Sequence, residues 1–249
     1  METKIKVGDV FKTNQGCTCT VISYKSRTSV LIEFNDQHKH RANVRAKHLQ
    51  SGYVKNPYYP AVRGRGFMGV GDFSAYRNGK VTDEYKKWSS MFRRCYSEVD
   101  AKDRNHYSDC EIHEDWFNFQ NFALWLAENK NYQPEYHLDK DLVFSGNRMY
   151  SPEACCLVPI EINNLLLDPK TKSRKLPMGV KIDGRSGRFV ASMRMGSKNK
   201  HIGSFDCPQE AHHAYVIVKE AHVKEVANRW RGRIDERVYD ALMNWRVTQ

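Results

Sequence analysis

Near the middle of the chain, residues that can bind metal or move protons lie close together at His137, Asp139, Lys140 and Asp141. On a strand, alternation places His137, Asp139 and Asp141 on one face and Lys140 on the other. Asn163 and Glu161 follow on a segment with the character of a short helix. One strand carboxylate and one oxygen from this helix can hold a hard cation, while substrate phosphate and water complete its shell.

Such a site is suited to the hydrolysis of a phosphodiester bond. The cation stabilises the leaving oxygen, and a base must activate water. Histidine is the common base, because its ordinary pKa is about 6.5. The alternative is that Asp139 and Asp141 are surface charges and that Asn163 and Asn164 only end a helix.

The elements that would position this site are short. The sequence predicts a strand over residues 137–141, a turn at 145–148, a second strand within 149–159 and a helix from residue 160. Upstream, a helix is predicted from Thr82, because aromatic residues recur at helical spacing in Tyr85, Trp88, Phe92 and Tyr96. A second helix is predicted over residues 113–130, with its inner side formed by Trp116, Phe119, Ala123 and Leu126.

Two β-rich segments flank this central part. Residues 1–52 contain "VGDVF", "CTVISY" and "SVLIEF" between turn residues, which predicts a small, SH3-like β-barrel. Residues 53–80 are rich in glycine and proline and read as a linker. Near the C-terminus, "GVKI", "RFVASMRM" and "KHIGSF" predict three antiparallel strands, and a helix is expected to start at Asp206 and Pro208. A further amphipathic helix is predicted over 231–249. The fold class is therefore α+β.

The formal net charge of +11 favours a polyanionic partner such as nucleic acid. Between Lys170 and Lys200, the only acid is Asp183, and the basic residues are Lys170, Lys172, Arg174, Lys175, Lys181, Arg185, Arg188, Arg194, Lys198 and Lys200. A basic sheet face can dock against double-stranded DNA, since strands as well as helices enter the major groove. A solvated, lysine-rich face is the alternative. Arg93 and Arg94, at the end of the first predicted helix, are further candidates for contact with the DNA backbone.

The C-terminal segment "GVKIDGRSGRFVASM…KHIGSFDCPQEAHHAY" resembles an AP2/ERF-type DNA-binding domain. The matching positions are Gly179, Gly203, Phe205, Glu210, Ala211, Ala214 and Tyr215. This family binds DNA through its sheet. The resemblance implies DNA contacts from Lys181, Arg185, Arg188 and Arg194, with Lys198 and Lys200 on phosphates.

The central segment "LDKD…GN..YSPE.C..VP..IN" resembles the strand–strand–helix HNH, or His-Me finger, nuclease motif of phage homing-endonuclease-like proteins. In that family HNH units often sit beside an AP2-type domain, which is the order found in this chain. The stretches "YKKWSSMFRRCY" and "DWFNFQNFALWL" are similar to the helices that precede the motif. The resemblance implies metal-dependent cleavage of DNA.

Compared position by position, the resemblance makes Asp139 and Asn163 the ligands of Mg²⁺ or another divalent metal. Lys140 stands where the family has its catalytic His, and Ala154 stands where an Asn usually steadies the loop. Lysine normally keeps its proton near neutral pH, so Lys140 is expected to hold the phosphate or stabilise charge in the transition state. His137 is the candidate replacement base.

These observations predict a DNA-binding, HNH-like endonuclease with parts at 1–52, 53–80, 81–170, 176–230 and 231–249. The alternatives are a catalytically inactive DNA-binding regulator or anti-host phage protein that keeps the HNH scaffold, and an RNA binder that uses the N-terminal barrel. The seven cysteines are odd in number and form no CxxC pair, which disfavours disulfides and structural zinc. No apolar window reaches the length of a membrane span, so we expect a cytoplasmic protein, in the host cell if phage-encoded.

Overall fold

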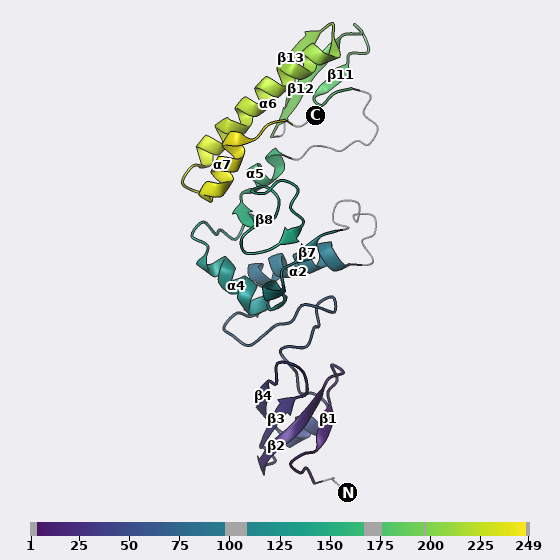
Figure 1. Ribbon diagram of the computed structural model, residues 1–249, viewed down its shortest axis with the longest axis vertical. Coiled ribbons are helices and arrows are strands. Elements are labelled where there is room, and N and C mark those ends of the chain that lie inside the picture. Colours follow the sequence, from purple (N-terminus) through teal and green to yellow (C-terminus); the bar gives the residue numbers. More distant parts are fainter. Residues whose placement is uncertain (1–3, 98–108, 167–175, 197, 248–249) are drawn as a thin grey trace. The chain divides into compact units, whose positions relative to one another are not determined.

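The computed structural model describes residues 4–97, 109–166, 176–196 and 198–247. The chain divides into two compact units, Met1–Glu128 and Asn129–Gln249. Each unit combines small sheets with helices, which confirms the predicted α+β class (Figure 1). Residues outside these ranges occur in four of the predicted segments, which are 1–52, 81–170, 176–230 and 231–249. Within the described ranges, no helix is both long and apolar enough to span a membrane.

The first unit begins with a four-stranded antiparallel sheet in the order β1-β2-β3-β4. Its elements are β1 (Val10–Lys12), β2 (Thr18–Ser26), β3 (Ser29–Phe34), β4 (Arg41–Val44) and the following helix α1 (Ala46–Gln50). Alternation along β3 buries Val30, Ile32 and Phe34 in one core with Leu49 of α1. The sequence predicts a barrel, but within residues 4–97 no strand pairing joins β1 to β4. The sheet is open, and α1 and Val54 complete its core.

Residues 53–75, the first part of the predicted linker, form an arm that is bonded at both of its ends. Buried Asn56 donates from Nδ2 to Asp36 Oδ2 at 2.5 Å, which fastens the arm to the sheet. Gln120 accepts from the backbone N–H of Phe73 at 3.0 Å and donates to the Phe73 carbonyl at 3.0 Å. The arm therefore connects the sheet to the helical part of the unit through specific hydrogen bonds.

The helical part follows the hairpin of β5 (Tyr76–Arg77) and β6 (Lys80–Val81). Helix α2 (Asp83–Tyr96) begins at Thr82, whose Oγ1 accepts from the backbone N–H of Tyr85 at 3.4 Å. The predicted aromatic stripe is confirmed as core, because Trp88 and Phe92 are fully buried.

The second predicted helix, over residues 113–130, is broken at Asn118 in the structure. Strand β7 (Glu111–Ile112) precedes a 3₁₀ turn, η1 (Glu114–Phe117), and the helix α4 (Phe119–Glu128). The arm causes the break: Phe67 donates its N–H to the Phe117 carbonyl at 2.8 Å and accepts from the Phe119 N–H at 2.9 Å. These strand-like bonds replace helical ones. The predicted inner side is nevertheless buried, at Trp116, Phe119, Ala123 and Leu126.

The second unit begins with a hairpin followed by a helix, in the order expected from the sequence. Strand β8 (His137–Asp139) pairs antiparallel with β10 (Cys156–Val158), and β9 (Met149–Tyr150) lies in the connection between them. Helix α5 (Ile160–Leu165) follows β10 directly. We call this arrangement the β8–β10–α5 module.

A three-stranded antiparallel sheet in the order β11-β12-β13 forms the other end of this unit, as predicted. The strands are β11 (Val180–Ile182), β12 (Phe189–Met195) and β13 (Lys198–Phe205), and they pack on helix α6 (Pro208–Trp230). Gly179 lies against Tyr215 of α6 so closely that an added Cβ would come within 2.1 Å of the ring. The helix begins at Pro208, as predicted, but Asp206 does not cap it. Cys207 precedes α6 without a side-chain cap, and Asp206 instead pairs with Arg188 at 2.9 Å.

Helix α6 serves two hydrophobic cores. Ala211 and Tyr215, near its N-terminus, pack on β12, whereas Val223 and Val226 belong to a core with α5 and β10. Helix α7 (Glu236–Asn244) completes this second core; its N-cap Asp235 accepts from the backbone N–H of Arg237 at 2.9 Å. The predicted segments 176–230 and 231–249 therefore share a core with the β8–β10–α5 module.

Candidate functional site

Asp139 ends strand β8 and shapes the loop that follows. Its Oδ1 accepts from the backbone N–H groups of Asp141 at 2.9 Å and Leu142 at 2.8 Å. These two bonds turn the chain out of the strand, because they occupy the N–H groups that a longer ladder would use. The strand predicted to reach Asp141 therefore stops two residues earlier, and Lys140 and Asp141 belong to the loop.

The register of the hairpin places Asp139 on the side of the sheet that faces α5. Asp139 lies opposite Cys156 across the two strands, and paired residues project to the same face. Cys156 is buried in one core with Ile162 of α5. Asn163, the second candidate ligand, is the next residue on that helix and is half-buried. The fold thus brings the elements that carry Asp139 and Asn163 together.

The environment of Asp139 is unfavourable for an isolated negative charge. Burial of the Asp139 carboxyl and, secondly, the charge of Asp141 raise the pKa of Asp139, while its two backbone N–H donors act in the opposite direction. A cation beside a carboxylate in such a place favours the ionised form.

Lys140 is buried and directs its ammonium into the loop. Nζ donates to Asp141 Oδ2 at 3.0 Å and to the carbonyl of Asn147 at 3.0 Å. The Asn147 side chain also binds the backbone of this loop: its Nδ2 donates to the carbonyls of Lys140 at 2.6 Å and Met149 at 2.7 Å. The two residues together close the loop between β8 and β9.

Asn147 is the residue that sequence reasoning missed. The resemblance assigns the bracing of this loop to the position of Ala154, which is buried and donates its N–H to Ser151 Oγ at 3.2 Å. Bracing comes instead from an asparagine in the turn "SGNR". Asparagine is common in turns, so its presence there gave no distinguishing signal. His137, the candidate base, is exposed on β8.

Two adjacent cysteines, Cys155 and Cys156, lie just before and at the start of β10, the strand that pairs with the one carrying Asp139. Burial raises the pKa of Cys155 to about 12 and also raises that of Cys156, which favours the thiol form of both at neutral pH. All seven cysteines are free. In the part of the chain that the structure describes, no group of three or more His, Cys, Asp or Glu side chains could hold a metal ion. Any cation here would rest on Asp139, Asn163, substrate and water.

The outer face of the β11–β13 sheet carries several of the predicted DNA contacts. Lys181 lies opposite Val190, and Arg194 lies opposite Asn199. Lys181 and Arg194 are exposed. The apolar face of the same strands packs on α6, through Ala191 and Met193. Arg188 and Arg185 are also exposed, and Arg188 pairs through Nε with Asp206.

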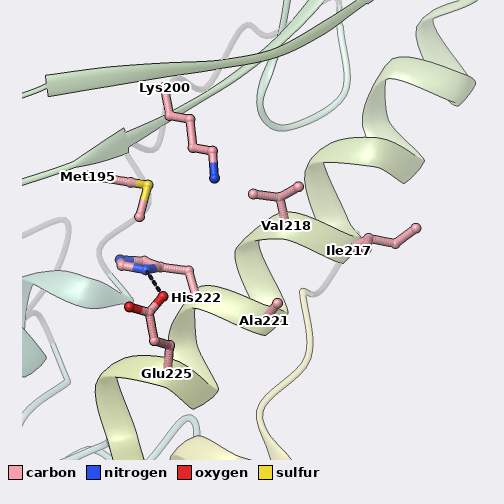
Figure 2. A pocket seen from close by; sticks show the side chains of 7 residues that line it. All are labelled: Met195, Lys200, Ile217, Val218, Ala221, His222 and Glu225. Atoms are coloured by element: carbon pink, nitrogen blue, oxygen red, sulfur yellow. Dashed lines mark ion pairs between the residues drawn. The ribbon is translucent and has the colours of Figure 1, made fainter. Parts of the chain in front are cut away.

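Lys198 and Lys200 belong to the other face of this sheet. In the register of β12 and β13, Met195 lies opposite Lys198 and Met193 lies opposite Lys200, so both lysines share the face that turns toward α6. Lys200 lines a groove of about 250 Å³ between the strands and α6. Figure 2 shows its side chain directed from the strand toward the helix. The groove also contains His222, whose Nδ1 lies 3.5 Å from Glu225 Oε2.

The remaining candidate contacts are divided between other places. Arg93 and Arg94 are exposed in the last turn of α2, in the first unit. The basic residues Lys170, Lys172, Arg174 and Lys175 lie outside the described residues.

Comparisons of this chain with protein-family models, with curated proteins and with solved structures found no match.

Proposed function

We propose that this chain is a DNA-binding, divalent-metal-dependent endonuclease that hydrolyses phosphodiester bonds of double-stranded DNA. The observation that carries the proposal is the β8–β10–α5 module, in which α5 covers the sheet face that bears Asp139. In this proposal Asp139 and Asn163 hold Mg²⁺. The cation would supply charge stabilisation at the leaving oxygen.

Two further residues have separate roles in this proposal. His137 is exposed on the strand that carries Asp139, and it is the base that takes a proton from water. Lys140 is a positioning residue: its ammonium is bonded to Asp141 and to the carbonyl of Asn147, so it fixes the loop after Asp139.

The proposal also assigns folds to three parts of the chain. We infer that the β8–β10–α5 module is an HNH-like unit and that the β11–β13 sheet with α6 is an AP2-like domain that contacts DNA. We also infer that the open N-terminal sheet has an SH3-like order of strands. The sequence motifs described above support these assignments, together with the matching order of strands and helices.

Metal removal tests the enzymatic part of the proposal. Supercoiled plasmid incubated with the protein and Mg²⁺ is expected to be converted to nicked or linear DNA, and excess EDTA is expected to stop the conversion. In a mobility-shift assay, EDTA should leave DNA binding intact, because the basic sheet face requires no metal. Conversion that continues unchanged in EDTA would contradict the proposed site.

The sheet face predicts a specific salt dependence of DNA binding. Replacing Arg188 and Arg194 by alanine should weaken binding to a DNA duplex and reduce the slope of log K against log[salt] by about 1.8, at about 0.9 per lost phosphate contact. Fluorescence anisotropy over a salt series measures both quantities. A matched control is Arg229→Ala with Arg231→Ala, which removes two exposed arginines at the far end of α6. An unchanged slope in the first variant would place the DNA interface elsewhere.

A second candidate function is non-catalytic DNA binding, as in a regulatory or anti-host protein. One observation favours it: the residue at the position of the usual histidine, Lys140, is buried and bonded within the loop. In this reading the β8–β10–α5 module is a scaffold that completes the core shared with α6. The plasmid assay separates the two candidates, since this protein would shift DNA without cutting it.

A further inference from the structure

The stretch from Lys4 to Arg65 in the first unit is strongly basic. Residues 4–65 contain twelve lysines and arginines and three acidic residues, an excess of nine against a net charge of +11 for the whole chain. All twelve of these side chains are exposed. The three acids are bonded locally: Glu33 to Arg41, Asp36 to Asn56, and Asp9 to the backbone of Lys6. The field around this sheet is therefore strongly positive.

A cluster of rings lies at the junction of the sheet and the arm. His38, in the loop between β3 and β4, stacks on Tyr58 of the arm, with ring centroids 4.3 Å apart and planes at 15°. Phe67 is tilted against both rings, at 5.3 Å from His38 and 5.6 Å from Tyr58. His38 is exposed, and Tyr58 and Phe67 are half-buried, so the cluster reaches the surface.

Local hydrogen bonds hold this cluster in place. Asp36 Oδ1 accepts from the backbone N–H groups of His38 at 3.0 Å and Lys39 at 3.1 Å, which fixes the loop. Asp36 Oδ2 accepts from Asn56, and Asn56 Oδ1 accepts from the Tyr58 N–H at 3.0 Å. One carboxylate and one amide therefore set the positions of both stacked rings before any ligand arrives, which lowers the entropic cost of binding.

Two cations close in sequence to the rings have left-handed backbone. Lys39 has a φ of 48° and Arg63 a φ of 52°, and they are two of the three non-glycine residues with positive φ within the described ranges. Lys39 follows His38 in the loop, and Arg63 lies in the turn that leads to Phe67, where Val62 and Gly66 form a β-bridge. Both side chains are exposed. Left-handed backbone costs energy at long side chains, and such residues are concentrated at binding sites.

We propose that His38, Tyr58, Phe67, Lys39 and Arg63, the ring–cation surface, bind single-stranded nucleic acid at a site separate from the proposed duplex interface. Nucleobases stack on exposed rings only when they are unpaired, because a duplex keeps its base faces covered. Stacking on aromatic rings and tracking of the backbone by cations is the way proteins bind single strands without reading sequence. The exposed lysines and arginines around the sheet supply the cations that would follow the nucleic-acid backbone.

The test uses the full-length chain and fluorescein-labelled oligothymidylate and oligouridylate of about 20 nucleotides, longer than the roughly 4–16 nucleotides that one small domain covers. His38→Ala removes an exposed ring and is expected to lower affinity for the single strand by about fivefold to tenfold. Binding to a duplex of the same length should change by less than about twofold, because its phosphates do not need the ring. A loss of affinity in His38→Ala for either oligonucleotide supports the proposal. Comparison of the wild-type affinities for oligothymidylate and oligouridylate shows whether DNA or RNA is preferred.

The charge component is tested with Lys39→Asn combined with Arg63→Asn. Asparagine tolerates left-handed backbone, so this variant removes two charges without adding strain. The salt slope for the single strand should fall by about 1.4, at about 0.7 per lost phosphate contact. The control is Arg77→Gln with Lys80→Gln, which removes two exposed charges from the β5–β6 hairpin of the same unit. The proposal would be overturned if both double variants lowered the salt slope for the single strand equally. It would also be overturned if His38→Ala left the affinity for the single strand unaltered.

Discussion

Replacing Asp139 by asparagine should lower the rate of Mg²⁺-dependent plasmid nicking by about 100-fold or more, the scale expected when charge stabilisation at the reacting phosphate is lost. Asparagine keeps an oxygen that can accept from the N–H groups of Asp141 and Leu142, so the loop retains its shape. The variant removes the charge alone. Nicking rates at saturating protein, measured beside mobility shifts on the same DNA, separate loss of cleavage from loss of binding.

Asn164, which follows the proposed ligand Asn163 on α5, provides a matched control. Asn163→Ala should also lower the nicking rate, because it removes the second proposed ligand. Asn164→Ala changes an identical, exposed side chain on the next residue and should leave the rate within about twofold of wild type, as is usual for exposed positions. If wild type cuts no faster than the Asp139→Asn, Asn163→Ala double variant while still shifting DNA, the endonuclease proposal fails and the non-catalytic candidate replaces it.

Placing proline at Ala221 should destabilise both ends of the second unit together. Ala221 is exposed on α6, between Tyr215 in one core and Val223 in the other. Proline in a helix interior costs about 3 kcal/mol or more, because it removes a hydrogen bond and clashes with the preceding turn. Since one helix supports both cores, we expect amide exchange in β12 and in β10 to become about 100-fold faster, as a loss of about 3 kcal/mol implies.

Hydrogen–deuterium exchange followed by mass spectrometry reads the two sheets separately. Ala221→Ser is the matched control, because it changes the same exposed position without removing a backbone donor, and it should leave both exchange rates close to wild type. Faster exchange in only one of the two sheets would mean that the β11–β13 sheet and the β8–β10–α5 module are stabilised independently. In that case the proposed DNA-binding sheet and the proposed cleavage module would unfold independently of each other.

Periodicity predicted the elements well wherever one face of a segment is buried. The stripe of Trp88 and Phe92 on α2 and the apolar face of β12 both lie in cores as expected. The order of hairpin and helix around Asp139 was predictable for the same reason: alternation, turn residues and helix starts are local signals. The break at Asn118 was not predictable, because it arises from hydrogen bonds with Phe67, about fifty residues earlier in the chain.

The sequence by itself determined the chemistry that is present: a carboxylate and an amide near the centre, a large positive charge, and one sheet with a basic and an apolar face. Only the tertiary structure decided how these groups are used. It turned the Lys140 ammonium inward to Asp141 and Asn147, and it placed Lys200 on the face of its sheet that turns toward α6. It also joined two cores through α6. Such outcomes depend on register and on contacts between distant segments, and local sequence carries little information about either.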